Sequence, residues 1–451
     1  MTAKLQCFLL GLLAVVAGCS SSGSDANGRA LACTVETQKQ AVADLMQEWY
    51  LFNDEVEQQQ RYAALDPSQF ATPEELLESL LYRPDRFDRN FSFITTPQVD
   101  ELFFANGQFV GFGFGSKFAD SPMNTDLRLT QIIAGSSAEA VGLARGHQIL
   151  TIDGRTIAEI QQAEGLSAAL GPGDVGVMRS LRVRRPDSSE FDVDITKALV
   201  TLDPVPQATT FTAGATTVGY LDFRTFVSTA DAELRQAFAQ FQAAGVTALV
   251  VDLRYNGGGL ASTAQLLTNL IGGFIADGQE QARTLYNSAK SALNQTTIFQ
   301  TQASSLTLLN QVVFITTGSS ASASELVINA LEPHSVVGLV GAPTFGKPVG
   351  QGGLSYCAGQ YLLRAVTFET VNSLGAGQFY DGLPVDCPAS DELERDIGDP
   401  LEASLASALG LVENGSCPVS VVTSKPAGYT DLIAPPLDPS ASAGQRYAGL
   451  Y

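Results

Sequence analysis

Histidine is almost absent from this sequence of 451 residues, which contains only His147 and His334. A Ser-His-Asp triad needs a histidine beside its serine. The sequence also has no Gly-x-Ser-x-Gly turn, the segment that presents the catalytic serine in many hydrolases. His334 follows a predicted helix in the segment Leu-Glu-Pro-His-Ser. We therefore expect His334 to lie at the end of that helix and not in a triad.

Basic residues are scarce as well. The 26 lysines and arginines are outnumbered by 47 aspartates and glutamates, and the formal net charge is -21. This balance argues against nucleic acid or an anionic membrane surface as the main partner. We interpret the acidic excess as a solvated surface. Hydrophobic residues make up 45% of the chain, which is sufficient for a globular protein of two or three domains.

The apolar run from Phe8 to Ala17 is too short to cross a bilayer as a stable helix. It follows Lys4, an arrangement typical of a signal peptide. The run ends in Val-Ala-Gly-Cys, which resembles a bacterial lipobox. The resemblance implies a lipoprotein signal peptide over residues 1–18, cleavage before Cys19, and a lipid on Cys19.

Residues 19–32 are rich in serine and are expected to form a flexible tether. The mature protein would then be lipid-anchored in a bacterial cell envelope and face the periplasm. Ser20, directly after the cysteine, is compatible with the outer membrane. An ordinary secreted protein with an incidental Cys19 is the alternative.

The cysteines do not form a zinc motif, because no Cys-x-x-Cys occurs and the residues are scattered. Four lie outside the predicted signal and lipidation site: Cys33, Cys357, Cys387 and Cys417. An even number in an exported chain favours two disulfides. We expect Cys357–Cys387, which would close one β-rich segment, together with Cys33–Cys417. Four buried thiols are the alternative.

Residues 33–105 are predicted to form an N-terminal helical region. The sequence from Val35 to Tyr50 has apolar residues at helical spacing, and Thr72 begins a Thr-Pro-Glu-Glu helix start signal. Trp49 is the only tryptophan, and we expect it to pack in the core or between domains.

Residues 107–200 are predicted to form a small β-rich domain. Glycine alternates with large apolar residues in GQFVGFGFGSKF, and GLARGHQILTIDG predicts a turn, a strand and an Asp-Gly turn. These motifs resemble the PDZ domain of bacterial tail-specific proteases. One departure is His147, which stands where that family usually has an acidic residue.

The PDZ resemblance implies that the small domain binds the C-terminus of a protein by adding it as a strand. The carboxylate would bind backbone amides of the loop that contains Gly111, Phe112, Gly113 and Phe114. Glycine suits such a loop because the backbone must approach the ligand closely. A structural β-module without a ligand is the alternative.

Residues 205–412 alternate predicted strands and helices, which indicates an α/β sheet. The segments TALVVDLRYNGGG and QVVFITTG are typical of buried strands, and SASASELVINALE is typical of a helix. Residues 413–451 are rich in Pro, Ser and Ala and are expected to form a loose tail.

Lysine is rare in the chain, yet Lys347 stands in a Gly-Lys-Pro turn after a hydrophobic strand. Burial disfavours the charged form of a lysine and lowers its pKa, so that the neutral amine can accept a proton from a serine hydroxyl. A surface lysine in a turn is the alternative.

The block Ser-Ala-Ser-Ala-Ser-Glu at 320–325 and the motif Thr-Phe-Gly-Lys at 344–347 resemble the Ser-Lys core of the C-terminal processing, or tail-specific, protease family. In that family the middle serine lies 25 positions before the lysine, as Ser322 does here. The resemblance implies that Ser322 is the nucleophile, Lys347 the general base and Gln351 the residue that orients the lysine. Pro348 is a departure, because most relatives have glycine there.

The segment from Asp252 to Gly259, DLRYNGGG, resembles the strand and loop before the oxyanion hole of the same family. The resemblance implies Gly258 or Gly259, with Ala323, as the amide donors to a developing negative charge. Asp252 and Arg254 are expected to be structural, as a buried pair.

The family implies a ClpP/crotonase-like α/β protease core with an inserted or preceding PDZ domain. We therefore expect a lipid-anchored serine endopeptidase that captures protein C-termini and needs no metal or cofactor. An activating adaptor protein is a candidate partner. Two alternatives use the same scaffold, a noncatalytic binding protein and an adaptor whose protease domain is dormant.

Overall fold

The computed structural model describes residues 32–120 and 123–418. The predicted signal peptide, Cys19, most of the predicted tether and nearly all of the predicted tail therefore lie outside the described residues. Among the residues that the structure describes, no helix combines the length and the apolar character that crossing a membrane requires.

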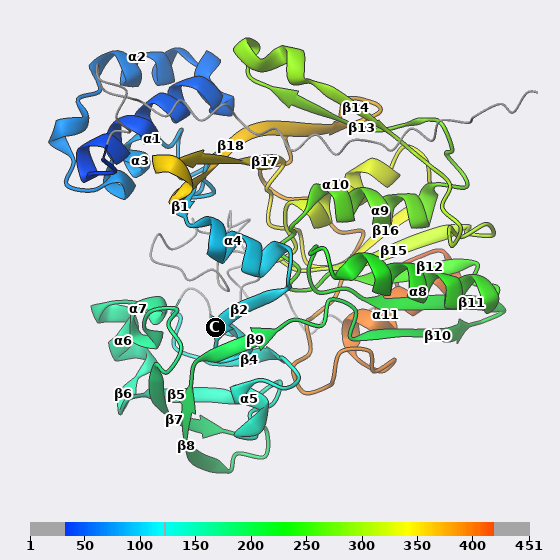
Figure 1. Cartoon of the computed structure of the whole chain (residues 1–451). Coiled ribbons are helices and arrows are strands. Elements are labelled where there is room, and N and C mark those ends of the chain that lie inside the picture. Colours follow the sequence, from blue (N-terminus) through cyan, green and yellow to red (C-terminus); the bar gives the residue numbers. More distant parts are fainter. Residues whose placement is uncertain (1–31, 121–122, 419–451) are drawn as a thin grey trace, which may run out of the picture.

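The core is a six-stranded sheet at the right of the molecule (Figure 1). Its strands, in spatial order, are β10 (Gln207–Ala213), β11 (Thr216–Asp222), β12 (Ala248–Asp252), β15 (Gln311–Thr316), β16 (Val337–Gly341) and β19 (Cys387–Pro388). All neighbouring pairs are parallel except β10–β11. Parallel strands must be covered on both faces, which explains the apolar sequence of β12 and β15.

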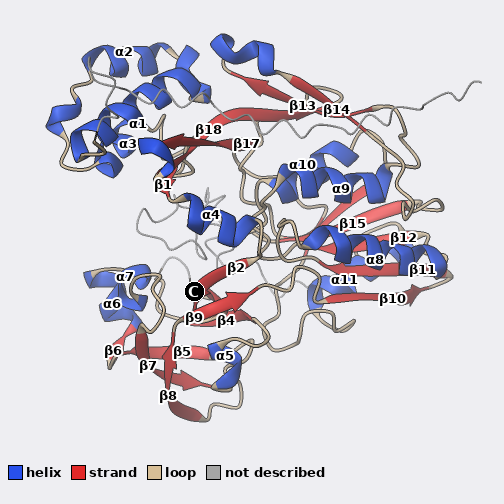
Figure 2. Cartoon of the chain, viewed as in Figure 1, coloured by secondary structure: helices blue, strands red, loops and turns tan. Residues whose placement is uncertain are grey.

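Helices cover the two faces of this sheet (Figure 2). On one face lie α8 (Ala230–Ala243), α9 (Ala261–Gly272) and α10 (Ala323–Leu331), and on the other lies α11 (Ala403–Asn414). Successive strand residues point to opposite faces. Leu249 and Val251 accordingly join the core cluster of α8 to α10, whereas Ala248 and Val250 join the cluster of α11. The predicted α/β fold is confirmed.

A second sheet carries the N-terminal region. It contains β1 (Phe93–Thr95), β18 (Tyr361–Asn372), β13 (Glu280–Tyr286), β14 (Gln295–Ile298) and β17 (Val349–Tyr356). The helical elements before and after β1 are α1 (Val35–Trp49), η1 (Leu51–Asp54), α2 (Val56–Ala64), η2 (Pro67–Gln69), α3 (Pro73–Leu80) and α4 (Pro97–Phe104). The prediction of a helical region over 33–105 missed β1, which pairs antiparallel with β18.

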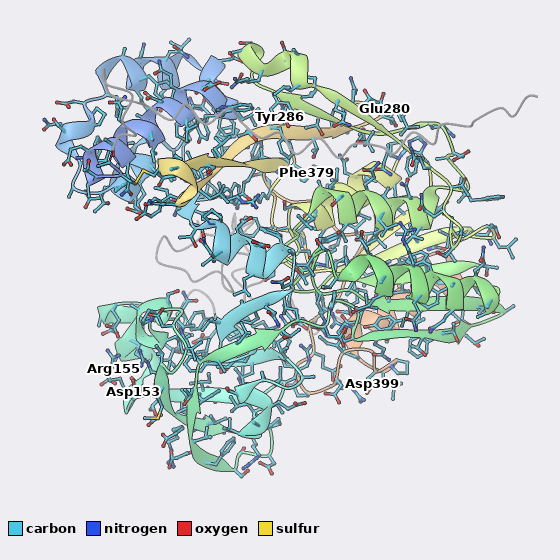
Figure 3. All side chains as sticks on the ribbon, in the orientation of Figure 1. Asp153, Arg155, Glu280, Tyr286, Phe379 and Asp399 are labelled. Carbon is cyan, nitrogen blue, oxygen red and sulfur yellow. A yellow bond between two sulfur atoms is a disulfide. The ribbon has the colours of Figure 1, made fainter. Side chains whose placement is uncertain are left out.

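The small module is a separate sheet with the order β3 (Phe114–Phe118), β4 (Leu127–Ile132), β5 (Gln148–Ile152), β7 (Met178–Arg184) and β8 (Glu190–Thr196). It also contains α5 (Ser137–Ala140), β6 (Arg155–Thr156), α6 (Ile157–Ala163) and α7 (Leu166–Leu170). The pair β2 (Gln108–Gly111) and β9 (Ala198–Thr201) joins it to the rest of the chain. In Figure 3, Asp153 and Arg155 of the module lie at the opposite end of the molecule from Tyr286 of β13.

The structure contains two disulfides, Cys33–Cys357 and Cys387–Cys417, so the predicted pairing was wrong. The error has a tertiary cause. Cys357 begins η4 (Cys357–Gly359), the turn between β17 and β18, whereas Cys387 lies in the other sheet. Helix α1 follows Cys33 and packs on β18, and α11 ends shortly before Cys417 and packs on the sheet that contains Cys387.

Removing the Cys33–Cys357 disulfide is expected to destabilise the protein by about 2–5 kcal/mol, because it closes a long loop in the unfolded chain. Its cysteines are 324 residues apart, against 30 for Cys387–Cys417. Denaturant unfolding of the two double Cys→Ser variants should give the larger loss for Cys33 and Cys357. A larger loss for Cys387 and Cys417 would contradict this ranking.

The predicted buried pair of Asp252 and Arg254 is confirmed. The Arg254 Nη2 atom lies 2.6 Å from Asp252 Oδ2, and both side chains are 1% exposed. Arg254 Nη1 also lies 2.8 Å from an oxygen of Glu402. Because removing one member would leave an uncompensated buried charge, the pair has a structural role at the base of the glycine loop that follows β12.

Candidate active site

Ser322 stands at the turn that leads into α10. Its backbone has φ 57° and ψ -110°, a left-handed φ that is uncommon for a serine. The side chain lines a cavity of about 190 Å³. Because Ser322 directly precedes the helix, the free amides and the dipole at this end favour negative charge beside it.

The two flanking serines have other roles. The Ser320 hydroxyl donates to the Leu253 carbonyl at 2.7 Å, and the Ser324 hydroxyl donates to the Asn256 carbonyl at 2.9 Å. Both hydroxyls are therefore used to attach the turn around Ser322 to the glycine loop after β12.

Lys347 and Gln351 line the same cavity as Ser322. The Lys347 ammonium donates to Gln351 Oε1 at 2.8 Å, and Gln351 Nε2 donates to the Phe91 carbonyl. Burial lowers the pKa of Lys347 to about 8, although the negative charges of Asp88 and Glu325 oppose this effect. Lysine can thus be largely neutral in mildly alkaline solution, which is the form that can accept a proton.

The rest of the cavity is mainly apolar. Its walls include Phe91, Phe104, Leu326 and Phe368, with Arg364 as a further cation. Arg364 is paired with Asp100, at 2.5 Å between Nη2 and Oδ2, which partly offsets its charge. The cavity therefore suits an uncharged, apolar group of a ligand.

The glycine loop lies directly against Ser322. A Cβ atom on Gly258, which has φ +101°, would be 2.9 Å from Ser322 Cβ and 2.8 Å from Ala323 N. The Gly258 amide donates to Asn256 Oδ1 at 2.9 Å. Gly258 is thus needed for this close approach, but its amide is already used in this structure. Gly259 and Ala323 both line the cavity and remain the candidate donors.

Glu325 and Arg89 are two site residues to which the sequence analysis gave no role. Glu325 is fully buried and accepts hydrogen bonds from the Ser322 and Lys347 amides, each at 2.8 Å. Arg89 is also fully buried and donates to the Phe345 and Gly346 carbonyls. The Ser-x-x-Glu spacing could have indicated Glu325, because it is the pattern of a helix capping box.

The predicted carboxylate loop of the small module lies between β2 and β3. The side chains of Phe112 and Phe114 are fully buried, with ring centroids 5.8 Å apart, so they belong to the module core. Gly113 has φ +92°, and a Cβ there would be 2.1 Å from Ser136 Cβ. Only backbone atoms of this loop could contact a ligand, and β3 beside it is at the edge of the sheet.

Neither histidine belongs to the cavity. His334 is close to the Glu280 carbonyl, at 3.0 Å from Nε2, and to the Ser373 hydroxyl, at 3.2 Å. His147 is buried in the small module, where burial lowers its pKa and its Nδ1 accepts from the Ala144 amide at 3.2 Å. Within residues 32–120 and 123–418, no group of three or more His, Cys, Asp or Glu side chains is placed to hold a metal ion.

Comparison with known proteins identifies the class. Residues 217–377 match the family described as Peptidase family S41, and residues 37–93 match the Peptidase S41 N-terminal domain. Both matches are to models of peptidase family S41, and the relatives that match the chain include carboxyl-terminal-processing proteases.

Two relatives are named carboxyl-terminal-processing proteases. The protein of Synechocystis sp. is 26% identical over 308 residues, which cover 67% of this chain and 66% of the relative. The protein of Picosynechococcus sp. is 30% identical over 245 residues, covering 52% of this chain and 54% of the relative. The chain thus spans about half to two thirds of the length of these relatives.

Solved structures support the same fold. The crystal structure of a putative S41 protease from Bacteroides fragilis has a TM-score of 0.63 at 24% identity and covers 83% of this chain and 97% of its own. The photosystem II D1 C-terminal processing protease has a TM-score of 0.55 at 20% identity and covers 84% of this chain and 97% of its own.

Proposed function

We propose that the protein is a serine endopeptidase that cleaves protein substrates with a Ser322–Lys347 dyad. The observation that carries this proposal is the shared cavity that contains Ser322, at a helix N-terminus, and Lys347, whose pKa burial lowers to about 8. A nucleophile and a base in one cavity are the minimum for acyl transfer. The match of residues 217–377 to peptidase family S41 supports the same reaction.

The reaction begins when the Ser322 hydroxyl attacks the substrate carbonyl carbon and the neutral Lys347 amine takes the hydroxyl proton. Gln351 Oε1 accepts one N–H of the amine, which leaves the nitrogen lone pair to accept the proton of the serine hydroxyl. The amides of Gly259 and Ala323 would stabilise the negative oxygen of the tetrahedral intermediate.

Breakdown of the intermediate completes the cleavage. The Lys347 ammonium returns its proton to the leaving amine as the peptide C–N bond breaks, which leaves an acyl ester on Ser322. Water then attacks the ester, with Lys347 again acting as the base, and hydrolysis releases the carboxylate product and regenerates the serine. No metal or cofactor is needed in this sequence.

We further propose that the small module captures the C-terminus of the substrate. Its edge strand β3 can accept an added strand, and the backbone of the preceding loop, with Gly111 and Gly113, can approach a carboxylate. The module also contacts the core close to the site, because Arg145 donates to the Tyr255 hydroxyl at 3.0 Å. Tyr255 lies in the glycine loop.

The lipobox-like segment that ends at Cys19 supports a location at a bacterial envelope, where a lipid anchor would hold the enzyme facing the periplasm. Metabolic labelling with palmitate tests this part. We expect the label on the wild type and none on Cys19→Ser. Equal labelling of both would contradict the anchor.

The test of the function is the digestion of an unstructured protein with an apolar C-terminus by residues 20–451, followed by mass spectrometry of the fragments. We expect cleavage of internal peptide bonds by the wild type, and slower cleavage when the substrate C-terminus is amidated. Equal rates for the free and amidated substrates would contradict capture of the carboxylate. Absence of cleavage by the wild type would contradict the peptidase proposal and favour a dormant or binding protein.

A further inference from the structure

The Glu325 carboxylate accepts hydrogen bonds from two different segments of the site. Its Oε2 atom accepts from the amides of Ser322 and Lys347, each at 2.8 Å. Its Oε1 atom accepts from the Gly346 amide at 2.7 Å and from the Thr344 hydroxyl at 2.5 Å. Burial raises the pKa of Glu325, but all four partners donate to it and thereby favour the ionised form.

A helix cap alone would explain only one of these four bonds. In a capping box, the carboxylate at the third helical position accepts the amide of the N-cap residue, here Ser322. The other three donors belong to residues 344–347, which precede β17 and carry Lys347. Glu325 therefore joins the turn of the proposed nucleophile to the loop of the proposed base.

Arg89 holds the opposite side of the same loop. Its Nη2 atom donates to the Phe345 carbonyl at 2.8 Å and to the Gly346 carbonyl at 2.7 Å. Its guanidinium carbon lies 4.1 Å from the centre of the Phe345 ring. The loop is thus held through its amides by Glu325 and through its carbonyls by Arg89, with both charges buried.

We propose that Glu325 and Arg89 are positioning residues that clamp the Lys347 loop against the Ser322 turn and so set the geometry of the dyad. This inference rests on the proposed peptidase function. It adds that residues 88–91, from the N-terminal region, form part of the active site, because Phe91 also accepts the hydrogen bond from Gln351.

The clamp predicts opposite effects of its two members on the protonation of Lys347. The charged groups that act on this lysine are Asp88 and Glu325, which raise its pKa, and Arg364 and Arg89, which lower it. Removing the charge of Glu325 should therefore lower the pKa of Lys347 below about 8, whereas removing that of Arg89 should raise it. A residue that stabilised the fold without lying beside Lys347 would leave this pKa unchanged.

The experiment uses Glu325→Gln and Arg89→Met. The side-chain amide introduced by Glu325→Gln would have one acceptor oxygen for four donors, and its NH2 group would oppose two of them. Because a misplacement of about 1 Å can cost 10²-fold in rate, we expect kcat/KM to fall by about 100-fold in each variant. The pH at which kcat/KM reaches half of its plateau value should be lower in Glu325→Gln and higher in Arg89→Met than in the wild type.

Competitive acetylation of the lysines across pH, with peptide mass spectrometry, measures the pKa of Lys347 without any need for peptidase activity. Opposite shifts in this assay would place both charges beside Lys347, as the clamp requires, even if the wild type cleaved no peptide, a result that would contradict only the peptidase proposal. Unchanged or parallel shifts in two folded variants would overturn the clamp.

Two matched controls separate the clamp from the general loss of a charge. Glu332 is an exposed residue at the end of α10, and Arg86 is a half-exposed residue close to Arg89 in the chain. Glu332→Gln and Arg86→Met should leave both the rate and the labelling profile unchanged. If Glu325→Gln does not fold, Arg89→Met decides the test. A higher pKa of Lys347 in that variant would support the clamp, and an unchanged or lower pKa would overturn it.

Discussion

Replacing Ser322 by alanine is expected to lower kcat/KM by at least about 10⁴-fold, because loss of a catalytic nucleophile removes the covalent route. The structure gives a physical reason to single out this serine from its block. Ser322 lines the cavity, whereas Ser320 and Ser324 donate their hydroxyls to loop carbonyls. The measurement is the steady-state cleavage of a fluorogenic peptide with an apolar sequence.

Ser319→Ala is the matched control for this experiment, since Ser319 is exposed and lies in the same turn. Its activity should equal that of the wild type. Activity of Ser322→Ala within about tenfold of the wild type would be too large for a nucleophile variant and would assign the reaction to another residue.

Replacing Lys347 by methionine is expected to reduce kcat by about 10²–10⁴-fold, the usual contribution of a general base. Methionine keeps much of the volume of lysine in the cavity but cannot accept a proton. In the wild type, kcat/KM should rise with pH and level off above about 8, because burial lowers the pKa of Lys347 to that value and only the neutral amine is active.

The pH dependence is the sharper part of this prediction. The rise through pH 8 should be lost in Lys347→Met, which retains no group that titrates in the role of the base. Lys290→Met is a suitable control, because Lys290 contacts Glu48 and Trp49 away from the cavity. A Lys347→Met variant with the wild-type pH profile would exclude Lys347 as the base.

The sequence predicted the parts of the site that lie in short, continuous motifs. Ser322, Lys347 and Gln351 lie in one continuous stretch of sequence, from the turn before α10 to β17, and the structure places all three around one cavity. The glycine loop was predicted for the same reason. The sequence could not decide between the amides of Gly258 and Gly259 as donors. That choice depends on the hydrogen bond of the Gly258 amide to Asn256, which forms only with the side-chain geometry of the folded loop.

The parts that the sequence analysis missed depend on contacts between distant segments. Arg89 lies 256 residues from Phe345, whose carbonyl it binds, and no local pattern indicates such a contact. The strand β1 has only three residues and exists because β18 pairs with it. The disulfide pairing likewise follows from which helix packs on which sheet.

The central claim is that Ser322 becomes acylated, and trapping the acyl-enzyme tests it most directly. The wild type would be mixed with an activated ester of an apolar, N-protected amino acid, quenched in acid within the first turnover, and mapped by peptide mass spectrometry. We predict an acyl group on Ser322 in the wild type and on no residue of Ser322→Ala. An acyl group on another residue, or turnover of the ester without any acylated protein, would contradict the account.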